Sequence, residues 1–162
     1  DVIYLQSRHF NENGLLLDEL KPDLNAFDIP QNHILQPNDI LFAAKGSKNF
    51  AAVYEKHNQP AVASSSFFVI RLNAIGVIPE FIVWYLNHPQ TQTLLKAQAR
   101  GTAIPSITKN VLCDMAVYVP SIEKQKAILI ISDLYQREKL IKQQIQILRE
   151  NQIQQQIFKA LK

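Results

Sequence analysis

The last part of the chain, residues 121–162, reads SIEKQKAILIISDLYQREKLIKQQIQILRENQIQQQIFKALK, and the rest of the fold is organised around it. It contains no proline and no glycine, and it is rich in Gln, Lys, Leu and Ile, which lose little rotamer freedom in a helix. Pro120 precedes it, Ser121 can cap the first turn, and Glu123 lies at the positive end of the helix dipole. We therefore predict one continuous helix, which spans roughly 60 Å at the usual rise per residue.

This helix is too long to be covered by the residues that precede it, so we expect part of it to meet another chain. Leu134, Ile141 and Leu148 are seven residues apart, which is the spacing of a coiled-coil seam. Towards the C-terminus the spacing becomes four, so the apolar stripe drifts around the helix. We therefore expect a few turns of antiparallel packing against another helix, and a role as spacer and oligomerisation arm. The predicted interface residues are Leu134, Ile141, Ile145, Leu148, Ile153 and Ile157.

The composition fits one ordinary globular domain that carries a helical arm. The chain has 162 residues, and 47% of them are hydrophobic. No apolar run approaches the roughly 20 residues that cross a bilayer, and no signal peptide is visible. The single cysteine, Cys113, excludes an internal disulfide framework and fits a reducing cytoplasm, which is where we expect the protein. Cys113 lies in the apolar run VLCDM, so we expect a buried small hydrophobe rather than a nucleophile.

The net charge of +3 is unevenly distributed along the chain. Residues 1–44 hold two basic and seven acidic side chains, whereas residues 45–109 hold seven basic and two acidic ones. A surface that faces phosphates would be built from the second block. The alternative is a solvated surface of mixed charge with no nucleic-acid partner.

Residues 1–120 combine short strands with inserted helices, which predicts an α+β domain with a small mixed sheet. Short runs rich in β-branched and aromatic residues are typical of strands. These runs are residues 2–6, 39–44, 51–54, 61–63, 67–72 and 115–119. Helices are predicted at residues 81–87, 90–99 and 108–112. The predicted domains are therefore residues 1–120 and the long helix of residues 121–162.

The sequence offers no recognisable catalytic constellation. His9, His33, His57 and His88 are scattered, and none has the spacing of a metal ligand with Cys or an acid. A metal-dependent nuclease of the Asp…Glu-x-Lys type needs an acid two residues before its lysine, but Ala43 holds that position before Lys45. Lys45-Gly46-Ser47 also lacks the frame of a phosphate-binding loop. These observations favour a binding protein with no catalytic residue, no metal and no cofactor.

Four segments in order resemble a known family. They are ILQPNDILFAAKGS, AVASSSFFVIRLN, IPEFIVWYLNHPQTQTLL and GTAIPSITKNVLCDMAVYVPSIEKQKAI. The last one leads into the long helix through Pro120, Gln125 and Ile128 in the pattern P-x-x-x-x-Q-x-x-I. Together they resemble the target recognition domain, and the conserved helix that follows it, of specificity subunits from type I restriction-modification systems.

The resemblance implies a DNA-binding domain with two loops that face DNA. Gly46 would permit a tight turn in the first loop, and Gly101, Thr102 and Ile107 match the second. Lysines in these loops can reach phosphates, whereas Arg and Asn or Gln are suited to guanine and adenine edges. The candidate DNA-binding residues are Lys45, Gly46, Ser47, Lys48, Asn49, Arg71, Arg100, Thr102 and Lys109, with Asn58 and Gln59 as further candidate base readers. The implied core residues are Ile40, Leu41, Phe42, Phe67, Phe68, Val69, Trp84, Tyr85 and Leu86.

Complete subunits of this family carry two recognition domains and two conserved helices, and this chain has room for one of each. It therefore resembles a half-subunit, and two half-subunits would be needed to read a bipartite site. The family also has a further segment before the strand that matches residues 2–6, and the chain begins at Asp1 rather than Met. We therefore expect a fragment, a recombined gene product or a short variant.

The resemblance implies sequence-specific recognition of double-stranded DNA as the specificity subunit of a type I restriction-modification system. The implied partners are a modification methyltransferase subunit, a restriction and translocase subunit, and a second copy or another half-subunit, with no membrane. S-adenosylmethionine, Mg²⁺ and ATP would belong to those partner subunits. Two alternatives stay open: an assembly or dimerisation protein derived from such a subunit without DNA-binding activity of its own, and an unrecognised nuclease.

Overall fold

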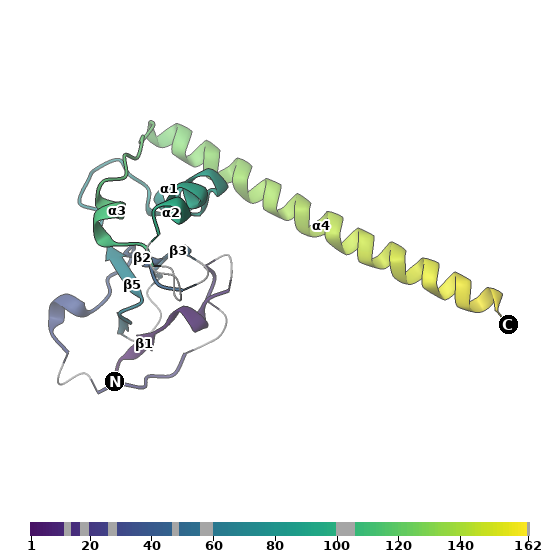
Figure 1. Ribbon diagram of the computed structural model, residues 1–162, viewed down its shortest axis with the longest axis horizontal. Helices are drawn as coiled ribbons and strands as arrows, with labels where there is room; N and C mark the ends of the chain where they lie inside the picture. The colour runs from purple at the N-terminus through teal and green to yellow at the C-terminus, as the bar shows by residue number, and fades with distance from the viewer. Residues whose placement is uncertain are drawn as a thin grey trace. The chain divides into compact units, whose positions relative to one another are not determined.

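The computed structural model describes residues 1–11, 14–16, 20–25, 29–46, 49–55, 60–99 and 106–161 (Figure 1). The chain divides into two compact units, Asp1–Ile122 and Glu123–Lys162. The first unit holds short strands and helices, and the second is a single long helix. The predicted α+β class is therefore confirmed.

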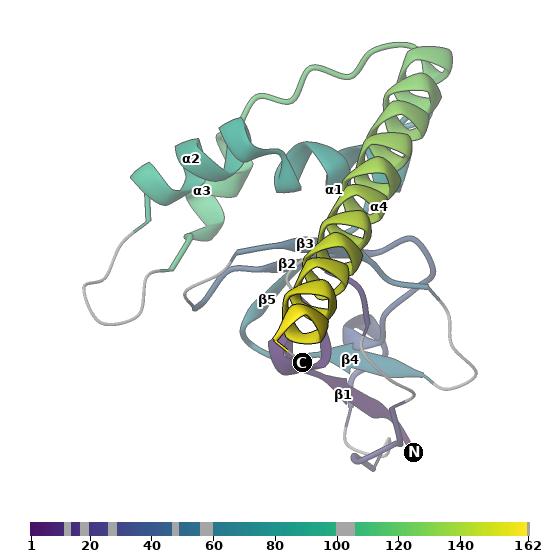
Figure 2. The ribbon, with the colours of Figure 1, turned by 90° about the vertical axis from the view of Figure 1, so that its right-hand side faces the viewer.

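The strands of the first unit form two small sheets rather than one mixed sheet. The strands are β1 (Ile3–Leu5), β2 (Ile40–Ala43), β3 (Ala51–Val53), β4 (Ala61–Ala63) and β5 (Phe67–Ile70). β1 and β4 pair in parallel, and β2 lies between β3 and β5 in an antiparallel sheet. The two sheets lie next to each other (Figure 2). Five of the six predicted strands are present, each within its predicted range.

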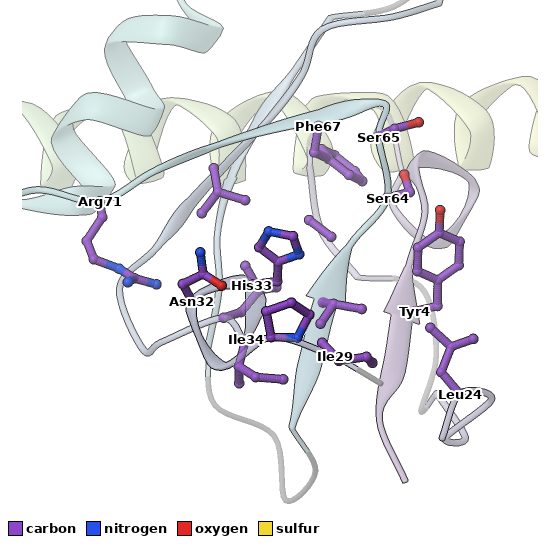
Figure 3. A pocket seen from close by; sticks show the side chains of 15 residues that line it. Tyr4, Leu24, Ile29, Asn32, His33, Ile34, Ser64, Ser65, Phe67 and Arg71 are labelled. Atoms are coloured by element: carbon purple, nitrogen blue, oxygen red, sulfur yellow. The ribbon is translucent and has the colours of Figure 1, made fainter. Parts of the chain in front are cut away.

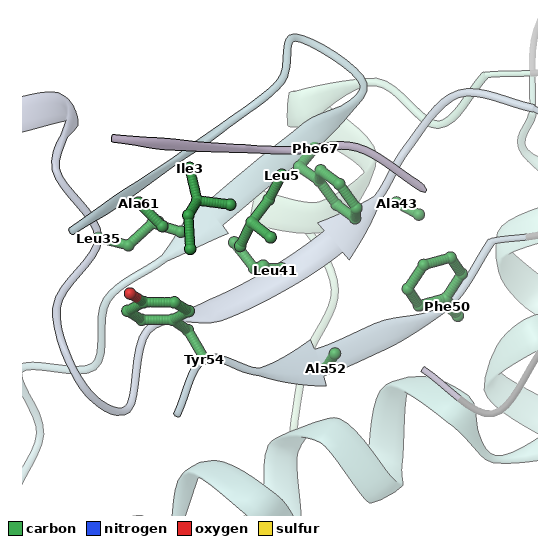
Figure 4. Packing of buried hydrophobic residues seen from close by; sticks show 10 residues of the cluster. All are labelled: Ile3, Leu5, Leu35, Leu41, Ala43, Phe50, Ala52, Tyr54, Ala61 and Phe67. Carbon is green, nitrogen blue, oxygen red and sulfur yellow. The ribbon is translucent and has the colours of Figure 1, made fainter. Parts of the chain in front are cut away.

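Side chains from both sheets form the hydrophobic core (Figure 4). All four residues of β2 are buried, because β2 is the central strand and is covered on both faces. Phe10, Phe50 and Phe67 form an aromatic cluster with ring centroids 5.6 to 6.0 Å apart. Edge-on and tilted pairs at such distances stabilise a core beyond the apolar area that they bury.

The predicted core is correct at its centre and wrong at Val69. The buried members are Ile40, Leu41, Phe42, Phe67 and Leu86, and the half-buried ones are Phe68, Trp84 and Tyr85. Val69 is 43% exposed and lines a hollow beside β5, although Phe67, two residues earlier on the same face, is buried. Cys113 is exposed, so the prediction of a buried thiol is wrong. It is the last residue of a short surface helix, and the apolar run around it is not a buried strand.

Two short helices cover the three-stranded sheet on the side away from β1 and β4 (Figures 1 and 2). They are α1 (Pro79–Asn87) and α2 (Pro89–Ala97), and each begins with a proline at its first position. His88 separates them, and its imidazole accepts a hydrogen bond from the Gln90 amide to cap α2. α1 packs against β3. The sequence did not reveal two 3₁₀ turns, η1 (Ser7–His9) and η3 (Gln31–His33).

The strand predicted at residues 115–119 is wrong. It follows α3 (Lys109–Cys113), which Thr108 caps as expected. Side chains in residues 115–119 alternate in part between half-buried and exposed, and Tyr118 is 83% exposed. No strand among the described residues pairs with this segment. The Tyr85 hydroxyl donates a hydrogen bond to the Ala116 carbonyl in this segment at 3.3 Å.

The long helix, α4 (Ile122–Ala160), is continuous over 39 residues, as predicted. Two ion pairs between residues four apart modestly stabilise the helix. They join Arg137 to Asp133 and Lys142 to Glu138. Gln125 is its buried residue, and the other described side chains of α4 are half-buried or exposed. Among the described helices, none is long and apolar enough to cross a membrane.

Candidate functional site

The two predicted DNA-facing loops meet at their bases. Lys45, just after β2, forms an antiparallel bridge with Ser106, although more than sixty residues separate them in sequence. Next to this bridge, the Ile107 amide donates a hydrogen bond to the Ala44 carbonyl at 2.8 Å. Ile107 is 2% exposed and anchors the junction in the core. We call the residues 44–46 and 106–107 the loop junction.

The first loop is closed at its neck by backbone and side-chain hydrogen bonds. The Ala43 amide donates to the Phe50 carbonyl at 2.8 Å, and the Asn49 side-chain amide donates to the Ala43 carbonyl at 2.8 Å. Gly46 has a φ of +119°, a conformation that other residues rarely adopt. The side-chain nitrogen of Asn49, a candidate base reader, thus serves loop closure in this structure.

Exposed cations lie in the loop junction and close to it in the sequence. The Lys45 side chain is exposed, and so is Lys109, which begins α3 three residues after Ser106. Lys96, near the end of α2, is also exposed. The structure thereby brings Lys45, Gly46, Asn49 and Lys109 to one end of the three-stranded sheet. Ser47, Lys48, Asn58, Gln59, Arg100, Gly101 and Thr102 lie outside the described residues.

Arg71 lies at the other end of the same sheet. It follows β5, whose end pairs with the start of β2, whereas Lys45 follows the end of β2. Its guanidinium donates two hydrogen bonds of 2.7 Å to the carboxylate of Asp39, which is only 1% exposed. These hydrogen bonds raise the pKa of Arg71. Burial, and then the charge of Asp39, raise the pKa of Tyr54 as well. The structure thus separates Arg71 from the other described candidates and pairs it with a buried acid.

Asn87, the last residue of α1, is a contact residue that the sequence did not single out. Its side chain accepts a hydrogen bond from the Ala51 amide and donates one to the Ala51 carbonyl, each at 2.8 Å. Ala51 is the first residue of β3, immediately after the first loop. The only sequence signal was a short amide side chain at the end of an otherwise apolar helix.

The predicted interface residues of α4 are all exposed, from 44% at Ile145 to 67% at Leu148. A second apolar stripe was missed, because its spacings alternate between eleven and seven residues. Its members are Leu129, Leu140, Ile147 and Phe158. At about 100° per residue, these positions lie within about 20° of one another around the helix. A search for an 18-residue period, which equals five helical turns, would have found it.

A hollow of about 500 Å³ lies beside β5 (Figure 3). Arg71 lies at one end, Tyr4 at the other, and His33 between them, with Phe67 and Val69 among the apolar lining residues. No group of three His, Cys, Asp or Glu side chains that could hold a metal ion occurs in the part of the chain that the structure describes. The hollow is broad and open, and its residues show no nucleophile paired with a base.

The comparison with protein families agrees with the family that the order of motifs resembles. Residues 21–150 match the family model described as the type I restriction modification DNA specificity domain. This match includes all of the strands except β1, the helices α1 to α3, and most of α4. No curated protein matches the chain. Because the family model covers most of its length, the chain belongs to the family of type I restriction-modification DNA specificity domains.

Proposed function

We propose that the first unit binds duplex DNA through the loop junction and reads a specific sequence for a type I restriction-modification system. Family membership supports a role in DNA sequence recognition. The observation that carries the placement is the bridge between Lys45 and Ser106, which gives two loops one common base. Lys45 belongs to this base and Lys109 lies three residues beyond Ser106, and both side chains are exposed. They would contact phosphates, while the loop tips would reach base edges.

The chain acts as a half-subunit in this proposal. A second copy or another half-subunit would supply the other half-site. Apolar side chains along α4 are exposed in the single chain, which supports a helix that packs against partners. Its two apolar stripes would allow contact with a second copy and with the methyltransferase subunit at the same time. The helix would set the distance between two half-sites.

The partner subunits would carry out the chemistry. Methylation with S-adenosylmethionine belongs to the methyltransferase subunit, and ATP-driven cleavage with Mg²⁺ belongs to the restriction and translocase subunit. The role of this chain is to direct both of them to one DNA sequence. No cofactor is assigned to its own residues.

Selection from a random duplex library, by the purified chain alone and with its methyltransferase subunit, tests this function. We expect an enriched bipartite sequence and binding that weakens steeply with salt, by a log–log slope of about −0.9 for each neutralised phosphate. In cells, deletion of the gene would remove methylation at the same sequence. A library that stays unenriched under both conditions would overturn the proposal.

A second candidate function is assembly without DNA binding, which the exposed apolar stripes of α4 favour. In that case the chain would self-associate, and its weak binding to DNA would be the same for every duplex. Enrichment in the library selection separates the two functions, because an assembly protein has no means to discriminate between sequences.

A further inference from the structure

β3 is an edge strand, and its first residue needs hydrogen-bond partners from outside the sheet. Ala52 faces Leu41 and β2, so the N–H and C=O of the preceding residue, Ala51, point away from β2. Such outward groups on an edge strand are unpaired unless a loop, a helix or water covers them. In this fold, the side chain of Asn87 covers both of them.

The carboxamide of Asn87 imitates the peptide group of a missing neighbouring strand. Its oxygen accepts from the Ala51 N–H at 2.8 Å, and its nitrogen donates to the Ala51 C=O at 2.8 Å. Among side chains, only Asn and Gln present a donor and an acceptor in this planar amide arrangement. A hydrophobic residue at position 87 could pack on β3 but could not fix the position of Ala51 along the strand.

Ala51 is also confined from another direction. A Cβ atom added at Gly14 would lie 2.6 Å from the Ala51 carbonyl oxygen and 3.3 Å from the Phe50 ring. The start of β3 is therefore held between Gly14 and Asn87. On its other side, the Phe50 carbonyl accepts from the Ala43 amide, which lies at the base of the first loop.

These contacts join α1 to the recognition loop through a short path. Asn87 is hydrogen-bonded to Ala51, and the carbonyl of the preceding residue, Phe50, accepts from the Ala43 amide. The carbonyl of the next residue, Ala44, accepts a hydrogen bond from the Ile107 amide. We propose that Asn87 is a positioning residue that fixes the loop junction in the geometry needed to discriminate between DNA sequences. This inference rests on the proposed function, because it assigns a part of the specificity to a residue outside the loops.

The substitution Asn87→Asp tests the inference, because it replaces one atom and can be reversed by pH. A carboxylate keeps the acceptor for the Ala51 amide but places a second acceptor against the Ala51 carbonyl. Protonation of the introduced carboxyl restores an O–H donor. The Ala51 carbonyl favours the protonated form of this carboxyl, whereas the Ala51 amide favours the ionised form. NMR of N87D therefore measures the pKa of the introduced carboxyl first, and the lower pH of the binding experiment is set below that value. The lost hydrogen bond should return as the pH falls from about 7.5 to this lower pH.

Gln90→Glu is the matched control, since it adds the same charge three residues away at an exposed position. His88, the titratable side chain next to Asn87, is present in the wild type and in both variants. At about pH 7.5 we expect N87D to lose about tenfold in preference for the selected duplex over a random one. Its affinity for the random duplex should change less than about twofold, and the preference should return at the lower pH, where the introduced carboxyl is protonated.

Two outcomes of the binding experiment would overturn the inference. One is an N87D variant with the preference of the wild type at both pH values. The other is a preference lost equally at both, because a packing defect would not respond to protonation.

NMR separates this inference from the proposed function. In N87D, the Ala51 carbonyl carbon and the Lys45 and Gly46 amides should titrate together, whereas in Q90E they should follow the wild type. If the wild type selected no DNA sequence but these resonances titrated together, the proposed function would fail while the link from Asn87 to the loop stood. If only the resonance of the Ala51 carbonyl carbon changed with pH, the positioning role of Asn87 would be wrong.

Discussion

Gly14 and Gly76 have similar backbone conformations in different surroundings. Their φ angles are +75° and +85°, both in the region that side-chain-bearing residues rarely adopt. A Cβ atom at Gly14 would collide with the Ala51 carbonyl, whereas nothing lies within 4 Å of a Cβ atom at Gly76. The two positions therefore separate backbone strain from steric conflict.

We predict that Gly14→Ala destabilises the first unit more than Gly76→Ala does. Gly76→Ala should cost about 1 kcal/mol from the positive φ alone. Gly14→Ala adds a conflict with backbone atoms, so we expect about 2–4 kcal/mol in total. Urea denaturation of the two variants measures the difference. Equal losses would mean that β3 shifts away from position 14 at no cost.

Arg71 and Asn49 illustrate where residue-level prediction from sequence fails. Both are residue types that read bases, and the chain gives no local sign of their actual contacts. Arg71 binds Asp39, 32 positions earlier, and Asn49 binds the Ala43 backbone. Such partners are set by the tertiary fold. Gly46, in contrast, was predictable, because a turn after a buried strand needs a residue that tolerates positive φ.

At the scale of elements, the sequence predicts what local composition decides. The buried strand β2, the proline-started helices α1 and α2, and the uninterrupted α4 follow from their own residues. Residues 115–119 have strand composition but no strand partner among the described residues, and pairing is not a local property. The loop junction and the Asn87 contact were likewise hidden, since each joins distant parts of the chain.

The loop junction predicts how individual lysines contribute to DNA binding. Lys45→Ala and Lys109→Ala should each weaken binding to all duplexes about equally and lower the salt slope by about 0.9. Lys21→Ala is the matched control, because Lys21 is exposed and lies in the acidic N-terminal block. Titrations at several salt concentrations measure the slopes. The same loss for Lys21→Ala would contradict the placement of the interface.

The apolar seam of α4 predicts self-association. Replacing Ile141, Ile145 and Leu148 together by Asp should give monomers, because buried carboxylates oppose helix packing. The control adds the same charge with the same helix propensity off the seam, by replacing Gln136, Gln143 and Gln154 by Asp next to the second stripe. Sedimentation equilibrium measures the masses. Unchanged mass in the first variant, or an equal loss in the control, would exclude this seam as the contact.

At the scale of the whole molecule, the chain combines one recognition unit with one arm. The two units, Asp1–Ile122 and Glu123–Lys162, have different physical character: the first has a packed core, and the second exposes apolar side chains along its length. A helix with exposed apolar residues on more than one face is typical of a segment that is buried in an assembly.

Assembly through α4 predicts a change in the footprint on DNA. The wild-type chain should protect two half-sites, and the triple Asp variant of the seam should protect one, with a salt slope about half as steep. Footprinting on the selected duplex measures both. Two protected half-sites for a monomeric variant would show that DNA, rather than the helix seam, holds the copies together.

The second stripe of α4 has a consequence for how the arm can change in length. Eighteen residues make five whole turns, so removing eighteen would shorten the helix by about 27 Å and leave every remaining side chain at its former angle. Removing seven would rotate the two ends by about 20° relative to each other. The rotation of one end of α4 relative to the other therefore depends on the length of the helix, and only some lengths keep the two ends aligned. Changes of length by whole turns would alter the reach of the helix and keep its two ends in the same relative orientation.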